Sequence, residues 1–331
     1  MGTKRNRRRI ETKTSRTAQY TCICRAASFR ERREWYKGSD DIAYNLVPGI
    51  IKLILKSSLL CQLCGKYLAP RGIYEYVIAR TKYMDSEFCD ALKKKFDQIV
   101  IFGAGFDSRA ERFDHLNKST KIFELDAPIT QQEKLKAFSK KKINVLENLI
   151  FVSINFNKES LSKKLIEAGF ETSRKSMFLM EEVTIYLSST AIDSTFSFIR
   201  HFSVKGSLVI FDYVNAGVLR KENKYHGEKD IFKTVSRAGE TWTFALEEGE
   251  IKSFLGHYGF SLKDHSNALQ LEKKYFRNPE GKILGKINGT HNIAIGSRRS
   301  STALRYQGQI VITSPAMCGI LPIGATRRTF S

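Results

Sequence analysis

Apolar residues follow two different patterns along the chain, and the change between them divides the sequence. Between residues 15 and 96 they recur at every third or fourth position, which predicts amphipathic helices. From residue 98 onward they form short runs that alternate with charged stretches of helical pattern. These short runs predict strands at residues 98–102, 121–124, 149–152, 177–180, 207–212, 260–262 and 291–295.

Strands that alternate with helices indicate right-handed βαβ units and a parallel sheet. We therefore expect an α/β fold of the Rossmann type, with a mostly parallel seven-stranded sheet. Residues 15–297 form the domain in this interpretation, and residues 15–96 form a helical lid at its start. Residues 298–331 lack regular periodicity and are expected to lie outside the fold as an irregular basic tail.

Positive charge is concentrated at the two ends of the 331-residue chain, whose formal net charge is +21. Residues 1–39 contain twelve Lys or Arg and three Glu, and residues 297–331 contain five Arg and no acidic residue. We expect residues 1–14 to form a disordered basic arm. Such an arm can bind nucleic acid through its phosphates, although most charge runs are simply solvated.

The cysteines and apolar segments add few further possibilities. Cys61 and Cys64 form a CxxC pair, but no second Cys or Cys/His pair follows at zinc-finger spacing, so we expect no metal site. We find no uncharged apolar run long enough to cross a membrane, and the basic N-terminus lacks the apolar stretch of a secretory signal. These features favour a cytoplasmic protein with reduced thiols.

The segment with most chemical information is the turn after the first predicted strand. Gly103 and Gly105 follow residues 98–102 directly, and glycine lets a backbone approach a ligand closely. Ligands of open α/β sheets bind at the carboxyl ends of the strands. Glu124 and Asp126 end the next predicted strand, where an acid can accept hydrogen bonds from ribose hydroxyls.

This pattern alone does not distinguish NAD from S-adenosylmethionine (SAM). The dinucleotide fingerprint requires a third glycine for close helix–strand packing, and Ser108 stands at that position. The serine disfavours an NAD-linked oxidoreductase.

Four motifs follow one another along the chain: Gly103-Ala-Gly-Phe-Asp-Ser-Arg109, Phe123-Glu-Leu-Asp-Ala-Pro128, Glu181-Glu-Val-Thr-Ile-Tyr-Leu187 and Val209-Ile-Phe-Asp-Tyr213. Together they resemble the leucine carboxyl methyltransferase family, in particular its bacterial branch that acts on small molecules. The resemblance covers roughly residues 15–297 and implies a class I methyltransferase fold with SAM as cofactor.

The resemblance also implies roles for two arginines. Arg80 matches the position that clamps the SAM carboxylate, and a guanidinium suits a bidentate contact. The alternative is a surface salt bridge of Arg80 with Asp85 or Glu87. Arg25 matches loosely a second cation near the methionine portion, and the alternative is a solvated helix position.

The resemblance also implies roles for the glycine turn and for an acid at the end of the second predicted strand. Gly103, with Gly105 beside it, matches the turn that contacts the methionine portion, and the alternative is a plain tight turn. Asp126 matches the acid that binds ribose, with Glu124 as the second candidate. The alternative for Asp126 is an acid at a helix N-terminus, since it lies just before Pro128.

Four further positions follow from the resemblance. Asn155 and Phe156 match the pair that binds the adenine amino group and stacks on the ring, although the family usually has Asp there; the alternative for Asn155 is an Asx-turn. Glu181 matches a glutamate facing the sulfonium region, and the alternative is a structural salt bridge. Tyr186 is the candidate catalytic residue of the acceptor pocket, and the alternative is a core tyrosine.

The sequence thus predicts a SAM-dependent methyltransferase that acts on a carboxyl or hydroxyl oxygen of a small molecule. No His, Asp or Glu stands out as a base, which favours a carboxylate acceptor. Residues 213–256 are expected to form the acceptor-side insertion, with Tyr213 and Trp242 as candidates for its wall. A nucleic-acid-binding protein or RNA methyltransferase remains the alternative. The sequence does not predict the oligomeric state.

Overall fold

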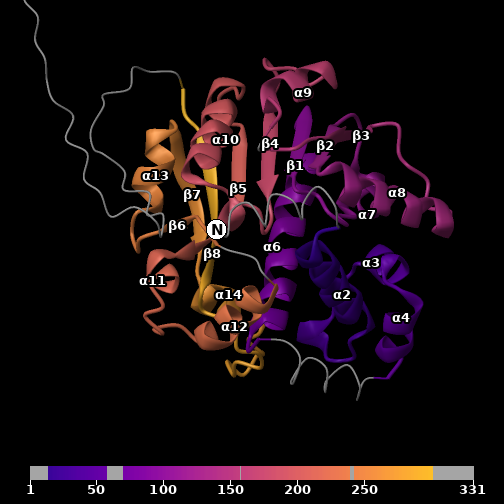
Figure 1. Cartoon of the computed structure of the whole chain (residues 1–331), viewed down its shortest axis with the longest axis vertical. Helices are drawn as coiled ribbons and strands as arrows, with labels where there is room; N and C mark the ends of the chain where they lie inside the picture. Colours follow the sequence, from indigo (N-terminus) through magenta and orange to yellow (C-terminus); the bar gives the residue numbers. More distant parts are fainter. Residues whose placement is uncertain (1–13, 58–69, 157, 239–241, 301–331) are drawn as a thin grey trace, which may run out of the picture.

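The structure is a computed structural model that describes residues 14–57, 70–156, 158–238 and 242–300 (Figure 1). All seven predicted strands are present in it. An eighth strand has only two residues, too few for periodicity to predict. The strands are β1 (Gln98–Phe102), β2 (Lys121–Asp126), β3 (Leu149–Ser153), β4 (Ser176–Met180), β5 (Leu208–Asn215), β6 (Ala245–Leu246), β7 (Phe260–Ser266) and β8 (His291–Arg298).

Helices precede the sheet and connect its strands. Several begin at a residue whose side chain accepts a backbone N–H three positions later, as at Ser160, Ser188 and Asn267. The α-helices are α2 (Arg16–Arg30), α3 (Asp41–Leu46), α4 (Gly49–Leu55), α6 (Ile73–Lys93), α7 (Arg109–Arg112), α8 (Pro128–Lys141), α9 (Leu161–Glu167), α10 (Ser189–His201), α11 (Ala216–Leu219), α12 (Glu228–Ala238), α13 (Ile251–His257) and α14 (Ala268–Tyr275). Three short 3-10 helices are η1 (Glu34–Tyr36), η2 (Asp114–Leu116) and η3 (Thr184–Tyr186).

The strands form one sheet in the order β3-β2-β1-β4-β5-β8-β7, and β6 pairs with β5. Strands β1 to β5 run parallel, whereas β8 lies antiparallel between β5 and β7. The sheet is therefore mostly parallel, as predicted. The strand order reverses between β1 and β4, and ligands of open α/β sheets bind at such a point.

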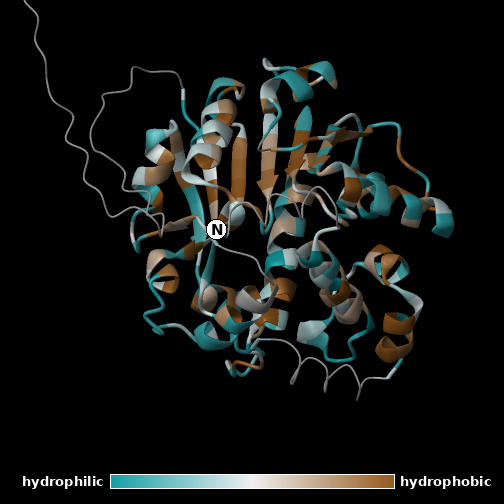
Figure 2. Ribbon diagram, in the orientation of Figure 1, coloured by the Kyte–Doolittle hydropathy of each residue, from teal (hydrophilic) through white to brown (hydrophobic). Residues whose placement is uncertain are grey.

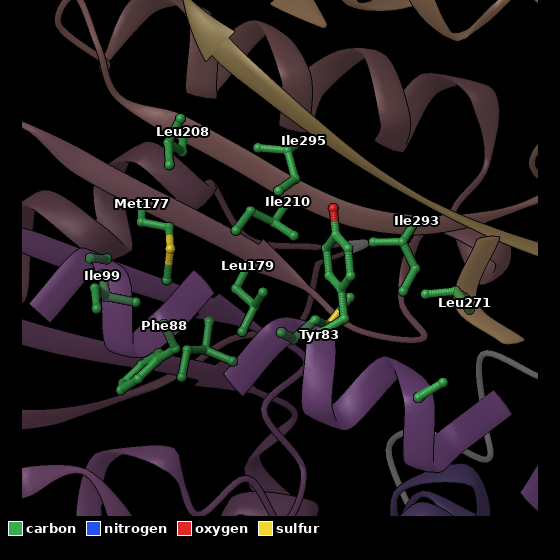
Figure 3. Close-up of a cluster of buried hydrophobic side chains, with 14 of the residues drawn as sticks. Tyr83, Phe88, Ile99, Met177, Leu179, Leu208, Ile210, Leu271, Ile293 and Ile295 are labelled. Atoms are coloured by element: carbon green, nitrogen blue, oxygen red, sulfur yellow. The ribbon is translucent and has the colours of Figure 1, made fainter. Parts of the chain in front are cut away.

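The central strands are buried on both faces, which explains their continuous apolar runs. Alternate residues of β1 face opposite sides: Ile99 and Ile101 join the core beneath α6, while Val100 and Phe102 join the core beneath α10 and α13. Figure 3 shows the first of these cores, and hydropathy colouring shows apolar ribbon along the central strands of the sheet (Figure 2).

The helices before β1 have two different places in the fold. Helix α6 packs its apolar stripe, including Tyr83 and Phe88, against one face of the sheet (Figure 3). Helix α2 packs against α3, α4 and α6 and extends to the carboxyl ends of the strands. The segment expected to be a lid thus contains both a core helix of the sheet and a covering helix.

Parts of several sequence predictions lie outside the described residues. These are the CxxC pair Cys61 and Cys64, the basic arm up to residue 13, and the tail from residue 301. Of the helices that the structure describes, none has the length and apolar character needed to cross a membrane.

The buried core gives a direct test of the fold. Replacing Leu179, which is fully buried in the middle of β4, by alanine removes apolar contacts and leaves a cavity. We expect Leu179→Ala to lower the free energy of unfolding by about 2–5 kcal/mol in urea titration. The matched control is Leu269→Ala in α14, whose side chain is 65% exposed and which should change stability by less than about 0.5 kcal/mol. Equal effects of the two substitutions would contradict this arrangement.

Candidate cofactor-binding site

A cavity of about 250 Å³ lies at the carboxyl ends of β1, β2, β3 and β4, with α2 over it. Its position at the reversal of strand order is the one expected for a ligand of an α/β sheet. Nine of the ten predicted site residues line it: Arg25, Arg80, Gly103, Gly105, Asp126, Asn155, Phe156, Glu181 and Tyr186.

The turn after β1 needs its two glycines. Gly103 and Gly105 have φ angles of +60° and +56°, in the left-handed region that side chains disfavour. A Cβ atom on Gly103 would lie 2.6 Å from Val183 Cγ2, and one on Gly105 would lie 2.8 Å from Ala18 Cβ. The turn therefore fits closely between α2 and the segment after β4, and its backbone forms one wall of the cavity.

Asp126, the last residue of the neighbouring strand β2, is hydrogen-bonded to this turn. One carboxylate oxygen accepts a hydrogen bond from the N–H of Gly105, and the other accepts one from the N–H of Ala127 at 2.6 Å. Burial raises the pKa of Asp126 to about 6, although both N–H groups favour the charged form. The carboxylate faces the cavity and keeps lone pairs for a ligand.

Glu124, the second candidate for ribose binding, does not line the cavity. It lies two residues before the end of β2, and its Oε2 is 2.5 Å from the Nζ atom of Lys134 in α8. Both side chains are 1% exposed. Glu124 therefore forms a buried ion pair beneath the edge of the sheet, and its proposed role at the ribose is wrong for this geometry.

Arg80 is completely buried in the middle of α6 and is surrounded by carboxylates. It pairs with Glu181 at 3.2 Å, with Asp212 at 2.8 Å and with Glu182. The surface salt bridge considered from the sequence is not formed, because Asp85 instead pairs with Arg109 and Arg112. The Nη2 atom of Arg80 makes no hydrogen bond to any described residue, although it is buried.

Arg25 joins α2 to the glycine turn. Its Nε atom lies 2.9 Å from Oδ2 of Asp40, and its Nη2 atom donates to the carbonyl oxygen of Phe106 at 2.6 Å. With 6% of the residue exposed, Arg25 is not in a solvated helix position. It holds α2 against the cavity and contributes positive charge to it.

Glu181 stands between two guanidinium groups where β4 ends. Arg109 Nη2 donates to one of its oxygens at 2.7 Å, and Arg80 Nε donates to the other at 3.2 Å. Burial by itself would raise the pKa of Glu181, but Arg109 and then Arg80 lower it to about 2. Glu181 is thus both a partner in salt bridges and a negative charge at the cavity wall.

The remaining predicted residues surround the other side of the cavity. Asn155 lies two residues after the end of β3, and its backbone N–H donates to Glu159 at 2.7 Å. The ring of Phe156 lies 6.3 Å from that of Phe102. The Tyr186 hydroxyl, on η3, lies 3.3 Å from Oγ1 of Thr17 in α2.

Tyr213 and Trp242, the candidates for the acceptor wall, do not line this cavity. Their exposed fractions are 3% and 4%, and each packs in an apolar cluster. Core packing, the alternative for both residues, describes them better. The segment 213–256 supplies α11, α12 and β6.

Three polar residues near the cavity were assigned no role from the sequence. Glu182 lines the cavity beside Glu181, and Asp212 binds Arg80 from β5. His291 begins β8 and lies behind Glu182. Glu182 and Asp212 belong to the quoted motifs and could have been considered, whereas His291 carries no sequence signal. In the described part of the chain, no group of three or more His, Cys, Asp or Glu side chains could hold a metal ion.

Comparison with known structures supports the fold. A "putative methyltransferase" from Thermobifida fusca has a TM-score of 0.53 at 14% identity, covering 85% of this chain and 94% of that one. A DUF574 family protein from Streptomyces avermitilis also has a TM-score of 0.53, at 11% identity, covering 88% and 100%. At these identities the likeness establishes a shared fold alone.

Sequence comparison finds similar proteins and a family model that matches part of the chain. The chain is 25% identical to YktD of Bacillus subtilis over 213 residues, which are 64% of this chain and 70% of that protein. It is 34% identical to a protein of Mycobacteroides abscessus over 131 residues, 40% of this chain and only 43% of that protein. Both relatives are named "Putative S-adenosyl-L-methionine-dependent methyltransferase". A family model described as leucine carboxyl methyltransferase matches residues 59–200. This match agrees with the resemblance that the sequence motifs gave.

Proposed function

We propose that the chain binds SAM in this cavity and transfers its methyl group to a carboxyl or hydroxyl oxygen of a small molecule. One observation carries the proposal: a turn of two left-handed glycines, an acid and a buried guanidinium surround a single cavity at the carboxyl edge of the sheet. The names of the sequence relatives agree with this cofactor.

The residues present fit the parts of SAM. Arg80 lines the cavity, and its Nη2 atom lies 3.2 Å from Glu181 without making a hydrogen bond to it or to any other described residue, so this donor suits the carboxylate of the methionine portion. Gly103 and Gly105 line the cavity without side chains, so the backbone of the turn can lie directly against a ligand. Asp126 suits the ribose hydroxyls, and Asn155 with Phe156 suits the adenine.

When bound, SAM supplies a methyl group activated by the positive charge on sulfur. The contribution of the chain is to bind, orient and exclude water. Glu181 keeps a negative charge at neutral pH, because its pKa is low, and this charge suits the sulfonium. Helix α2 covers the cavity, and Tyr186 lies on the side where we place the acceptor.

The competing functions have less support. The nucleic-acid hypothesis depended on the basic ends, and most of these residues lie outside the described part of the chain. For NAD, Ser108 replaces the third glycine, and it donates a hydrogen bond to Asp40 at 2.8 Å in a fully packed position. Calorimetric titration with SAM and S-adenosylhomocysteine (SAH) is the primary test, and absence of binding by the folded protein would refute the proposal.

The glycine turn can be tested with a control for backbone strain. Gly105→Ala introduces a Cβ next to the cavity at a left-handed position, so we expect SAH affinity to fall at least about tenfold by calorimetry, or about 1.4 kcal/mol. Gly169→Ala is the matched control, because Gly169 has φ +89° and open space around it. The left-handed backbone should cost each variant about 1–2 kcal/mol of stability, Gly105→Ala should lose more because its Cβ contacts Ala18, and Gly169→Ala should bind SAH normally. Equal affinities of the two variants would argue against binding at this turn.

Asp126 predicts a pH dependence of binding. Burial raises its pKa to about 6, so the acceptor form is lost as the pH falls below this value. We expect SAH to bind about tenfold more weakly at pH 5 than at pH 7.5. Asp126→Asn should bind weakly at both pH values and should lack this dependence. An affinity of the wild-type protein that is flat over this range would exclude the carboxylate as a ligand-binding group.

A further inference from the structure

Glu182 adopts an unusual backbone conformation at the wall of the cavity. Its φ angle is +57°, a left-handed value that costs free energy for a residue other than glycine. The backbone N–H donates to Asp212 at 2.8 Å, and Oε2 pairs with Arg80. These contacts hold the side chain in place and leave Oε1 directed away from Arg80, towards His291.

His291 lies directly behind this oxygen. Its Nε2 atom is 3.9 Å from Oε1 of Glu182, too far for a hydrogen bond, and it has no hydrogen-bond partner among the described residues. The residue is 1% exposed and is held between aromatic rings: Tyr76 stacks on it at 4.6 Å, and Trp242 contacts it edge-on at 5.2 Å.

The hydrogen-bond network assigns the tautomer of His291. Asn288 donates from Nδ2 to the carbonyl oxygen of Arg71 at 2.9 Å, so its Oδ1 faces Thr290. The single hydroxyl proton of Thr290 must therefore point to Asn288 Oδ1 at 2.6 Å. The Thr290 oxygen can then only accept from Nδ1 of His291, 2.7 Å away. The proton of the neutral ring is on Nδ1, and Nε2 carries a lone pair.

Burial keeps His291 neutral. Burial lowers its pKa to about 4, Asp212 opposes this shift and Arg80 adds to it. The titratable and charged groups that face it are Tyr76 and Arg80 from α6, Asp212 from β5, and Glu182 after β4. At neutral pH two hydrogen-bond acceptors, Nε2 and Oε1, thus face each other without a proton between them. A buried acceptor without a donor costs free energy.

We propose that Glu182 and His291 form a proton-accepting pair for the methyl acceptor, and that the acceptor oxygen is therefore a hydroxyl. This inference rests on the proposed function and names its substrate class. Glu182 lines the cavity, so a bound hydroxyl would donate to its carboxylate, whereas a bound carboxylate would bring a third acceptor and a like charge. Glu182 is the catalytic residue of the pair, and His291 is a positioning residue behind it.

The step balances with these groups alone. The hydroxyl proton passes to Oε1 of Glu182, on the side that faces Nε2 of His291, while the oxygen electron pair forms the new bond to the methyl carbon. The bond between that carbon and sulfur breaks, and its electrons remain on sulfur. The proton leaves to solvent after the methylated product, so no metal or oxidant is needed.

Nitrogen NMR of the full chain labelled with ¹⁵N-histidine tests the pair without any activity assay. The chain has six histidines, and His291→Asn identifies the signal by its loss. In the protein saturated with SAH, we expect His291 to be neutral with its proton on Nδ1. Phenol should shift the Nε2 resonance, and benzoate, which carries a carboxylate on the same ring, should not.

Variants and a control complete the design. Glu182→Gln keeps the shape of the side chain but removes its charge, and should weaken phenol binding at least tenfold. His265 lies on the neighbouring strand β7, and its ring is hydrogen-bonded to Tyr213. As the control, His265→Asn should leave the response to phenol unchanged. Unchanged signals of the other five histidines would show that each variant is folded.

Three results would overturn the proposal: a proton on Nε2, a response to benzoate at least equal to that to phenol, or no response to phenol. If SAH binds and one of these results is found, the pair is wrong and the proposed function stands. If SAH does not bind to the wild-type protein, the proposed function itself fails.

Discussion

The burial of Arg80 is the constraint on which the site depends. A guanidinium without solvent contact must be compensated by carboxylates, and removing one partner from such a pair is strongly destabilising. Its partners are Glu181 and Glu182, which directly follow β4, and Asp212 in the adjacent parallel strand β5. The charge of Arg80 therefore fixes α6 against β4 and β5, and it places two carboxylates at the cavity wall.

The same principle extends across the site. Arg109 joins Glu181 to Asp85 and Asp107, and Arg25 and Arg112 lie beside Asp40. This connected cluster contains four guanidinium groups and six carboxyl groups, which are Asp40, Asp85, Asp107, Glu181, Glu182 and Asp212. An excess of acid around a buried cavity favours a ligand with net positive charge, as SAM has.

Most of the fold could be predicted from the sequence, because each strand is a short apolar run and each connection has helical pattern. What the sequence could not predict is how deeply a given side chain is buried within its helix or strand. Glu124 and Asp126 are two residues apart, so strand alternation places both on one face and cannot rank them. Only the structure shows that Glu124 lies beneath the edge, opposite Lys134. Arg80 was similarly ambiguous, since its helix has both buried and exposed faces.

The pair formed by Glu182 and His291 could not be found in this way, because it depends on strand direction. Residues 291–295 were predicted to form a strand, but periodicity does not say whether a strand is parallel. Since β8 runs antiparallel to β5, its first residue, His291, lies beside Val214, near the carboxyl end of β5. Because β8 is antiparallel to its neighbours, its amino end lies at the carboxyl edge of the sheet. Glu182, after β4, and Asp212, in β5, lie near the same edge. The sequence argument for a carboxylate acceptor relied on the absence of a base; in the proposed pair Glu182 is that base, and the antiparallel strand supplies the histidine that positions it.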